Sequence, residues 1–248
     1  MGKVIYDFRG ERYVVTGASS GIGRRVCEDL VRHGATVLAL GRDKGRLEKL
    51  RQQKTESIYT ASLDINDFAA LEGSIKAFVQ SCGKIHGGVH AAGITGITPL
   101  RSYERFEVRQ IMDTSFWAGI EFLRLITKSR YACQGTSTVL FSSVCAQSHE
   151  KGMFAYAAAK AAVNAAIGSV AKEISSRGHR VNSVLPGWID TPMTESMNMG
   201  SGKEIVQMRG LLGSGSPADI SQTVLFLLSD ASRWITGAHI PVDGGYLA

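Results

Sequence analysis

Short apolar runs alternate with amphipathic segments along most of the chain. Residues 12–16 and 36–40 are nearly continuous in apolar side chains, a pattern that indicates strands buried on both faces of a sheet. Between them, residues 21–33 place Val26 and Leu30 on one face, as expected for a helix that packs against that sheet. Further strands are expected near 58–61, 89–93 and 138–142, and further helices at 44–53, 68–81 and 155–176. This alternation predicts an α/β fold: a doubly wound (Rossmann) parallel sheet of about seven strands with helices on both faces.

The composition is compatible with one domain that spans residues 1–248. The chain has 248 residues and 44% hydrophobic content, enough to bury a sizeable core. Its formal net charge is +6, but Lys and Arg are scattered among Asp and Glu rather than gathered in a basic run. This distribution argues against a nucleic-acid partner, and an anionic small molecule is an easier match.

The sequence also lacks the usual signals for secretion, a membrane span or a metal. The N-terminal residues have no apolar signal core, and no run of 18 apolar residues appears. The four cysteines have no CxxC or other metal-ligand spacing, and Cys27 falls on the apolar face of helix 21–33. We therefore expect a reduced, cytoplasmic setting, no metal and no membrane contact.

A glycine-rich turn joins the first strand to the first helix. Its glycines are spaced GxxxGxG, which fits the general dinucleotide fingerprint only loosely. Glycines let the backbone approach a pyrophosphate, and the helix N-terminus offers free N–H groups and the positive end of a dipole. The turn therefore predicts a coenzyme phosphate site at Gly17, Ser19, Ser20, Gly21, Ile22 and Gly23.

The end of the second strand bears on the choice of coenzyme. An acid there would bond the adenosine ribose hydroxyls and repel a 2′-phosphate, whereas an arginine would attract it. Gly41 occupies the expected acid position and Arg42 follows it, which favours NADP(H) over NAD(H). A strand end one residue later would make Asp43 the acid and favour NAD(H). Alternatively, Arg42 and Asp43 only cap helix 44–53.

Other candidate coenzyme contacts follow the third and fourth strands. Asp64 either accepts a hydrogen bond from the adenine amino group or begins helix 68–81, and Ile65 comes directly after it. Ala92 and Gly93 are small residues that let a planar ring lie against a strand end. Because the carboxyl ends of parallel strands share one edge of a sheet, these residues are expected to converge with the glycine turn.

Three polar residues form the candidate catalytic group. Tyr156 and Lys160 are four apart in an alanine-rich run, so on a helix both side chains project from one face. An ammonium beside a phenol favours the phenolate and is expected to lower the tyrosine pKa. Ser143, at the end of strand 138–142, is placed to hydrogen-bond a substrate carbonyl. Together the three residues predict a proton-transfer site for a carbonyl and its alcohol.

With these motifs in this order, the chain resembles the short-chain dehydrogenase/reductase family in its single-domain form. The resemblance rests on TGxxxGIG at 16–23, Asp64, AG at 92–93, Ser143, YxxxK at 156–160, PG at 186–187 and VDGG at 242–245. It implies that Tyr156 is the general acid for reduction and the general base for oxidation, that Lys160 holds the nicotinamide ribose, and that Ser143 orients the carbonyl. It also implies hydride transfer between nicotinamide C4 and the carbonyl carbon, with coenzyme contacts at Pro186, Gly187, Ile189 and Thr191.

Two positions depart from the family pattern. Ser115 stands where the family usually has an asparagine that supports a proton-relay water beside the lysine. Serine bonds a water but is shorter and lacks the amide, so we expect a retained relay with slower proton exchange. His90 and Ala91 stand where the family often has two asparagines. His90 either reaches the adenine side or, as we favour, is a packed structural histidine.

The substrate end carries weaker signals. Residues 191–216 contain methionines and leucines broken by glycines, a composition that suits a mobile apolar lid. The candidate pocket residues are Phe154 and Trp188, with polar contacts from Gln147, His149 and Glu150. The substrate itself is expected to be a small-molecule carbonyl compound or alcohol.

Three functions remain in competition. The leading prediction is an NADP(H)-dependent carbonyl reductase or alcohol dehydrogenase. The nearest alternative is a 3-oxoacyl-(acyl-carrier-protein) reductase, in which Arg130 and Arg177 face an acidic carrier rather than simply lying at the surface. A non-catalytic NADP(H)-binding sensor is the alternative from another class. The alanine-rich helix 155–176 permits close helix packing and the family commonly forms tetramers, so we expect a homodimer or homotetramer.

Overall fold

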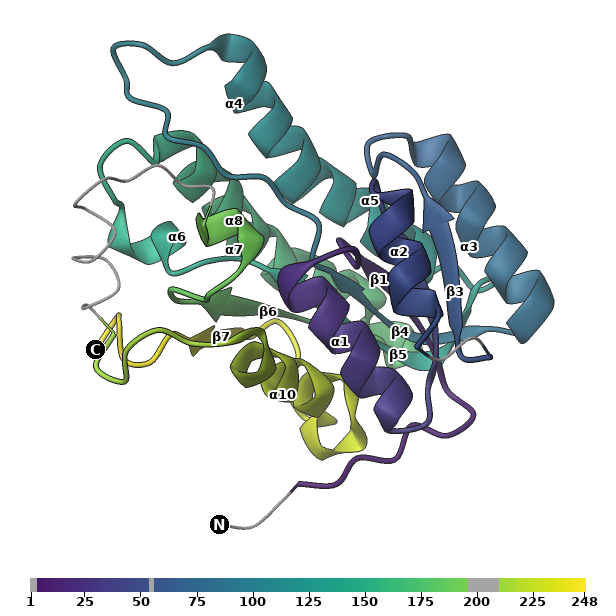
Figure 1. Ribbon diagram of the computed structural model, residues 1–248. Coiled ribbons are helices and arrows are strands. Elements are labelled where there is room, and N and C mark those ends of the chain that lie inside the picture. The colour runs from purple at the N-terminus through teal and green to yellow at the C-terminus, as the bar shows by residue number, and fades with distance from the viewer. Residues whose placement is uncertain (1–3, 54–55, 196–209) are drawn as a thin grey trace.

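The computed structural model of the chain describes residues 4–53, 56–195 and 210–248 (Figure 1). The strands in these residues are all parallel and form one sheet in the order β3-β2-β1-β4-β5-β6-β7. They are β1 (Arg12–Thr16), β2 (Thr36–Gly41), β3 (Ile58–Ser62), β4 (Ile85–His90), β5 (Ala132–Phe141), β6 (Arg180–Pro186) and β7 (His239–Val242). This seven-stranded parallel sheet confirms the fold predicted from the sequence.

Helices cover both faces of the sheet (Figure 1). One hydrophobic core lies beneath α1 (Gly21–Arg32), α2 (Lys44–Arg51) and α10 (Pro217–Leu228). The opposite face is covered by α3 (Phe68–Cys82), α5 (Ala118–Ile126) and α7 (Phe154–Ile174). The shorter helical segments are α4 (Arg105–Met112), α6 (Cys145–Ser148), α8 (Pro192–Glu195), the π-helical η1 (Asp113–Trp117), and the 3₁₀ segments η2 (Ser175–Arg177) and η3 (Asp230–Ser232).

The apolar pattern of the sequence accounts for these layers. Val14 and Val15 of β1 are both fully buried, and they belong to the cores on opposite faces of the sheet. On α1, the side chains of Val26, Cys27 and Leu30 are fully buried against the sheet. Burying one such aliphatic side chain contributes roughly 2 kcal/mol. Cys27 is therefore a core residue, as its position in the sequence indicated.

The strand order reverses between β1 and β4. From β1 the chain proceeds through β2 and β3 to one edge of the sheet, then returns to β4 and proceeds to the other edge. In sheets of this kind, ligands bind in the crevice at the carboxyl ends of the strands where the order reverses. The glycine turn after β1 and the segments after β4 and β5 line this crevice.

One helix in the described residues, Phe154–Arg177, is long and apolar enough by composition to cross a membrane. It consists of α7 and η2, and it packs across β5 and β6. Val163 and Ile167 are fully buried in this contact. We therefore assign it to the core of the α/β domain.

Candidate active site

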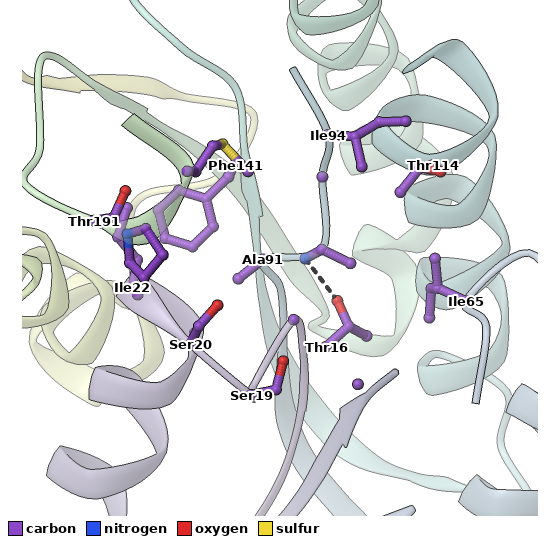
Figure 2. A pocket seen from close by; sticks show the side chains of 18 of the residues that line it. Thr16, Ser19, Ser20, Ile22, Ile65, Ala91, Ile94, Thr114, Phe141 and Thr191 are labelled. Atoms are coloured by element: carbon purple, nitrogen blue, oxygen red, sulfur yellow. Dashed lines mark hydrogen bonds between the residues drawn. The ribbon is translucent and has the colours of Figure 1, made fainter. Parts of the chain in front are cut away.

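A cavity of about 670 Å³ opens at the carboxyl edge of the sheet (Figure 2). This volume is within the range of small-molecule and cofactor sites. Thr191 and the glycine turn lie on one side of it, and Ile65, Ile94 and Thr114 lie on the opposite side (Figure 2). Except for Ser115, every catalytic or coenzyme candidate from the sequence lines it: Gly17, Ser19, Ser20, Gly21, Ile22, Gly23, Arg42, Asp64, Ile65, Ala92, Gly93, Ser143, Tyr156, Lys160, Pro186, Gly187, Ile189 and Thr191.

Close backbone packing explains two glycines of the turn. Gly17 has a φ of +66°, in the left-handed region, and a Cβ atom there would lie 2.7 Å from the backbone of Ala91 and Ala92. At Gly23, a Cβ atom would lie 2.5 Å from the Gly17 carbonyl oxygen. A larger residue at either position would push the turn away from β4 or from its own helix.

The N-terminus of α1 reaches the cavity without a side-chain cap. Ser20 is the N-cap residue, but its side chain makes no capping hydrogen bond, and the first turn of α1 has no acidic residue. The first N–H groups and the positive end of the helix dipole therefore remain for an anion. Thr191 borders this place, because its Cγ2 would lie 3.4 Å from a Cβ atom at Gly21. This part of the cavity fits a pyrophosphate.

Two arginines flank the end of β2. Gly41 is the last residue of the strand, and both Arg42 and Arg46 line the cavity. Asp43 is the N-cap of α2: its carboxylate accepts the Arg46 backbone N–H at 2.9 Å and pairs with the Arg46 guanidinium at 3.2 Å. Arg46 was not among the residues predicted from the sequence, although its spacing of four residues from Arg42 was a usable signal.

The segment after β3 shows which of the two roles considered for Asp64, an adenine contact or the start of helix 68–81, is compatible with the structure. Asp67, not Asp64, caps α3 by accepting the Ala70 N–H at 3.0 Å. Asp64 instead accepts the Asn66 backbone N–H at 2.9 Å and lines the cavity beside the buried Ile65. The prediction that Asp64 simply begins the helix is therefore wrong, and the adenine contact stays a proposal.

His90 belongs to a buried hydrogen-bond network beneath the cavity. Its Nδ1 lies 3.0 Å from the Thr16 hydroxyl, and its Nε2 lies 3.2 Å from the Thr114 carbonyl oxygen. Because Nε2 must donate to that carbonyl, Nδ1 accepts from Thr16, whose oxygen accepts the Ala92 N–H (Figure 2). Burial and then the charge of Lys160 lower the pKa of His90 to about 3. His90 is thus a packed structural histidine, as we favoured from the sequence.

The catalytic candidates meet where β5 and α7 face each other. Ser143 follows β5, whereas Tyr156 and Lys160 are on α7. Lys160 Nζ donates to the Phe141 carbonyl oxygen at 2.8 Å, and the Lys160 carbonyl accepts the Ser142 hydroxyl at 2.8 Å. Lys160 Nζ lies 5.5 Å from the centre of the Tyr156 ring. These bonds hold the ammonium and the phenol in one cavity with Ser143.

The pKa of Tyr156 departs from the expected direction. Burial raises this pKa above its usual value, the Cys145 thiol raises it further, and a hydrogen bond with Ser143 lowers it. The Lys160 ammonium is bonded to Phe141 and lies over the tyrosine ring, so it does not offset burial. Burial also lowers the pKa of Lys160 to about 8. In this geometry the phenol keeps its proton at neutral pH, as a general acid for reduction requires.

Ser115 lies behind the cavity on the π-helical segment η1, an irregularity that often marks functional sites. Its side chain is fully buried, and its Oγ has no hydrogen-bond partner in the described part of the chain. A Cβ atom at Gly93 would lie 3.5 Å from Lys160 Nζ and 3.7 Å from Ser115 Oγ, so both groups border the same small space. A buried unpartnered hydroxyl beside an ammonium fits a bound water.

The structure describes the two ends of the predicted lid at 191–216. The helix α8 lies at its start. At its other end, the Gly215 N–H donates to the Trp188 carbonyl, and the Gly215 carbonyl accepts the Asp190 N–H, both at 2.9 Å. The central part, 196–209, lies outside the described residues, together with three of the lid methionines, Met197, Met199 and Met208.

The residues predicted to line the substrate pocket do not all lie in one pocket. Trp188 and Glu150 line a second, smaller pocket beside the catalytic candidates. Phe154 and His149 line a hollow against α7. Gln147 is exposed. The side chains nearest to the reacting groups are therefore those of the smaller pocket.

Comparison with known proteins assigns these features to a family. A family model described as enoyl-(acyl carrier protein) reductase matches residues 17–247. The 3-oxoacyl-(acyl-carrier-protein) reductase FabG of Vibrio harveyi is 31% identical over 239 residues, which cover 96% of this chain and 98% of that protein. The reductase of the same name from Thermotoga maritima is 31% identical over 240 residues, which cover 95% of this chain and 97% of that protein.

Comparison with solved structures leads to the same family. A short-chain type dehydrogenase/reductase from Mycobacterium ulcerans aligns with a TM-score of 0.91 and 29% identity, covering 97% of this chain and 91% of its own. A short-chain dehydrogenase/reductase from Brucella melitensis, at 24% identity, has the same fold with a TM-score of 0.92 over 98% of this chain and 99% of its own. The chain belongs to the short-chain dehydrogenase/reductase family. It is an oxidoreductase that acts on C=O and CH–OH groups with a nicotinamide coenzyme.

Proposed function

We propose that this enzyme is an NADP(H)-dependent oxidoreductase that interconverts a ketone and a secondary alcohol. The strongest support is that Ser143, Tyr156 and Lys160 line the same cavity as the glycine turn and two arginines. A phosphate-binding turn alone would fit many nucleotide ligands. The proton-transfer group at the other end of the cavity restricts the chemistry to a carbonyl and its alcohol.

Separate parts of the cavity suit separate parts of the coenzyme. The N-terminus of α1 would hold the pyrophosphate, and Arg42 and Arg46 would hold the 2′-phosphate. Gly41 offers no acid at the end of β2, and the Asp43 carboxylate is paired with Arg46, which favours NADP(H) over NAD(H). When bound, NADPH supplies the hydride from nicotinamide C4. The remaining contacts that we propose are Asp64, Ile65, Ala92, Gly93, Pro186, Gly187, Ile189 and Thr191.

During reduction, the substrate carbonyl oxygen would accept hydrogen bonds from Ser143 and Tyr156. Tyr156 then donates its phenolic proton to that oxygen as negative charge develops on it. Lys160, with a pKa of about 8, carries its proton at neutral pH, so a positive charge lies 5.5 Å from the centre of the ring on which the phenolate forms. In the oxidation, the same phenolate removes the proton of the alcohol.

We further propose that Ser115 holds the water through which the tyrosine and lysine recover a proton. The buried Ser115 hydroxyl and the Lys160 ammonium border the same space at Gly93, which supports this role. A serine offers one hydroxyl where an asparagine offers a carbonyl and an amide. Proton exchange is therefore expected to be slower than with an asparagine.

A panel of ketones and alcohols, with NADPH and NADH compared side by side, tests the proposed function. Reduction should consume NADPH, seen as a loss of absorbance at the reduced nicotinamide band, and kcat/KM should be higher than with NADH. Tight NADPH binding without hydride transfer to any ketone would contradict the proposal. That result would favour the non-catalytic sensor, which the comparisons do not support.

A 3-oxoacyl-(acyl-carrier-protein) reductase is the second candidate. The names of the relatives from V. harveyi and T. maritima, both 31% identical over nearly whole chains, favour it. Arg130 and Arg177 add little, because Arg130 pairs with Glu72 at 2.5 Å and Arg177 donates to the Thr127 carbonyl at 2.8 Å. Turnover of a 3-oxoacyl thioester in preference to small ketones would select this candidate.

We also propose a cytoplasmic homodimer or homotetramer. The exposed alanines Ala158, Ala161 and Ala165 of α7 allow a second helix to approach closely. All four cysteines are free, which suits a reducing compartment. Light scattering that gave the mass of a single 26.7 kDa chain at micromolar concentration would contradict the assembly.

A further inference from the structure

The π-helical segment η1 changes the backbone bonding of the helix that carries Ser115. In an α-helix, the Ala118 N–H would donate to the Thr114 carbonyl, four residues before it. In η1 it donates to the Asp113 carbonyl instead. The Thr114 carbonyl thereby loses its usual helical donor. A buried carbonyl in this position needs a hydrogen bond from another part of the molecule.

His90, at the end of β4, supplies that hydrogen bond. Its Nε2 lies 3.2 Å from the Thr114 carbonyl oxygen, and its imidazole is buried. A Cβ atom at Gly119 would lie 3.0 Å from His90 Cδ2, so the ring packs directly against the next turn of the helix. Its Nδ1 lies 3.0 Å from the Thr16 hydroxyl, which holds the ring from β1. His90 thus replaces the helical donor that the π-helical turn takes away.

The side chain of Thr114 is held from another direction. Its Oγ1 accepts a hydrogen bond from Asn66 Nδ2 at 3.1 Å, and Asn66 lies between β3 and α3. The Asp64 carboxylate in turn accepts the Asn66 N–H at 2.9 Å. Thr114 is therefore tied to two strand ends, by its carbonyl to β4 and by its side chain to the segment after β3. Ser115 is the next residue, so these ties fix its position as well.

The position of Ser115 matters because of the group that its hydroxyl faces. Its Oγ is buried without a hydrogen-bond partner among the residues described, and it borders the same small space at Gly93 as Lys160 Nζ. A water that relays a proton in this space must lie within hydrogen-bonding distance of both groups, about 2.6–3.2 Å. A displacement of the helix by about 1 Å would break that chain of bonds.

We propose that His90 is a positioning residue: through the Thr114 carbonyl, it holds the π-helical turn that places the Ser115 hydroxyl beside Lys160. The inference rests on the proposed function, because it explains how the serine reaches its place in the proposed proton relay. His90 itself is buried beneath the cavity and does not line it, so its effect on the reaction is indirect.

Replacement of His90 by two amides separates the bonds of its two nitrogens. The amide of asparagine reaches the position of Nδ1, whereas the amide of the longer glutamine reaches that of Nε2. His90→Asn should therefore lose the bond to Thr114, and His90→Gln should keep it. At neutral pH, hydrogen–deuterium exchange of the Ala118 amide, followed by NMR, should be about tenfold faster in His90→Asn than in the native enzyme. In His90→Gln it should stay near the native rate.

His179→Asn is the matched control for these exchange measurements. It also replaces a buried histidine whose Nδ1 accepts a backbone N–H, that of Thr136 at 3.1 Å. His179 directly precedes β6, at the amino edge of the sheet and therefore away from the cavity. This variant should leave the exchange of Ala118 unchanged. Equal acceleration in His90→Asn and His179→Asn would overturn the inference, because both changes would then act only through global stability.

A double-mutant cycle tests whether His90 acts through Ser115. With NADPH and a ketone, His90→Asn should lower kcat severalfold and raise the solvent isotope effect on kcat, while KM and the Kd for NADPH change by less than about twofold. In a Ser115→Ala background, which has no hydroxyl to position, the same replacement should cause no further loss of kcat. An equal loss in both backgrounds would overturn the inference, because His90 would then affect the reaction by another route.

A measurement on the native enzyme needs no variant to fold. In a ¹H–¹⁵N NMR spectrum at neutral pH, the His90 ring should be the Nε2–H tautomer, with that proton protected from exchange by its bond to Thr114. An Nδ1–H tautomer could not donate to the Thr114 carbonyl. Its detection would overturn the inference.

The exchange measurement separates this inference from the proposed function. If the native enzyme reduces no ketone, or if Ser115→Ala turns over as fast as the native enzyme, the proposed reaction or relay fails. Faster Ala118 exchange in His90→Asn, with recovery in His90→Gln, would then still establish that His90 positions the turn that carries Ser115. If Ala118 exchanges at the native rate in His90→Asn, the inference is wrong even where ketones are reduced as proposed.

Discussion

The coenzyme end of the cavity is shaped by backbone, whereas the substrate end is shaped by side chains. At the coenzyme end, Gly17 and Gly23 allow main-chain atoms to pack where any Cβ atom would collide. At the substrate end, the small pocket combines side chains from distant segments, including Thr95, Glu150 and Tyr246. The coenzyme end can therefore bind the same coenzyme in many relatives, while the side chains at the substrate end can change with the substrate.

The polar groups of the two ends also differ in how they are satisfied. Beneath the coenzyme end, Thr16, His90 and Thr114 form a complete hydrogen-bond network. At the substrate end, the Thr95 hydroxyl and the Trp188 indole N–H are buried without partners among the described residues. Complete networks stabilise the fold, whereas unpaired buried groups reserve part of their binding energy for a ligand.

Tyr156→Phe should separate chemistry from coenzyme binding and have the largest effect. Loss of the proton donor should lower kcat by about 10²–10⁴-fold, while the Kd for NADPH should change by less than about twofold, because the ring is retained. Steady-state kinetics and fluorescence titration measure the two quantities. Tyr59→Phe, an exposed tyrosine on β3, should change neither. Equal losses in kcat and coenzyme affinity would show that Tyr156 shapes the cavity instead.

His90→Asn should reveal how the network beneath the coenzyme end contributes to stability. The folded pKa of His90 is about 3, below its unfolded value of about 6.5. Between these values only the unfolded chain takes up the proton, so stability falls as the pH falls. From pH 6.5 to 4.5, the native enzyme should lose about 2 kcal/mol of unfolding free energy that His90→Asn does not lose.

Urea unfolding at the two pH values measures this difference. His149→Asn changes an exposed histidine and serves as the control, which should keep the acid sensitivity of the native enzyme. The same acid-induced loss in His90→Asn would mean that other groups cause it. The network would then matter for the shape of the site rather than for its response to pH.

Local patterns of the sequence predicted the backbone-built end of the cavity. The strand at 12–16 has the bounds of β1, and the helix expected at 155–176 corresponds to α7 and η2. Apolar periodicity and glycine spacing are properties of adjacent residues, so one sequence is enough to recognise them. The alignment of the glycine turn with Tyr156 and Lys160 was then predictable from the rule that ligands bind at the carboxyl edge of a parallel sheet.

Contacts between distant segments could not be predicted from the sequence. The bond between Glu150 and Tyr246 joins positions 96 residues apart, and no spacing indicates it. We expected Lys160 to lower the pKa of Tyr156, but burial of the phenol raises this pKa. The Lys160 ammonium donates its hydrogen bond to the Phe141 carbonyl instead of to the phenol. The direction of a side chain and its depth of burial decide such a pKa. The spacing of two residues along a helix predicts neither.

Arg42→Ala should weaken the preference for NADP(H) over NAD(H). A guanidinium that bonds a phosphate contributes about 1.5–3 kcal/mol, so the Kd for NADPH should rise at least about tenfold. The Kd for NADH, which lacks the 2′-phosphate, should change by less than about twofold. Arg51→Ala at the far end of α2, where Arg51 pairs with Glu48 at 3.6 Å, is the matched control. Equal losses for both coenzymes would remove the basis for preferring NADP(H).

Ser115→Asn should have the smallest effect, and it tests the proposed water between Ser115 and Lys160. An asparagine amide offers a donor and an acceptor to the proposed water, so turnover should rise severalfold if proton exchange limits it. The solvent isotope effect on kcat should become smaller in the same variant, while the Kd for NADPH stays unchanged. The added volume in a fully buried position works against this gain, so unfolding free energy must be measured in parallel.

Ser115→Ala provides the matched comparison, because it removes the hydroxyl and adds no volume. Its turnover should fall and its solvent isotope effect should grow. If Ser115→Asn is folded yet turns over no faster than the native enzyme, the proposed relay is wrong. The unpartnered hydroxyl would then be a consequence of the π-helical turn in η1, and the proton on Lys160 would be replaced from the open side of the cavity.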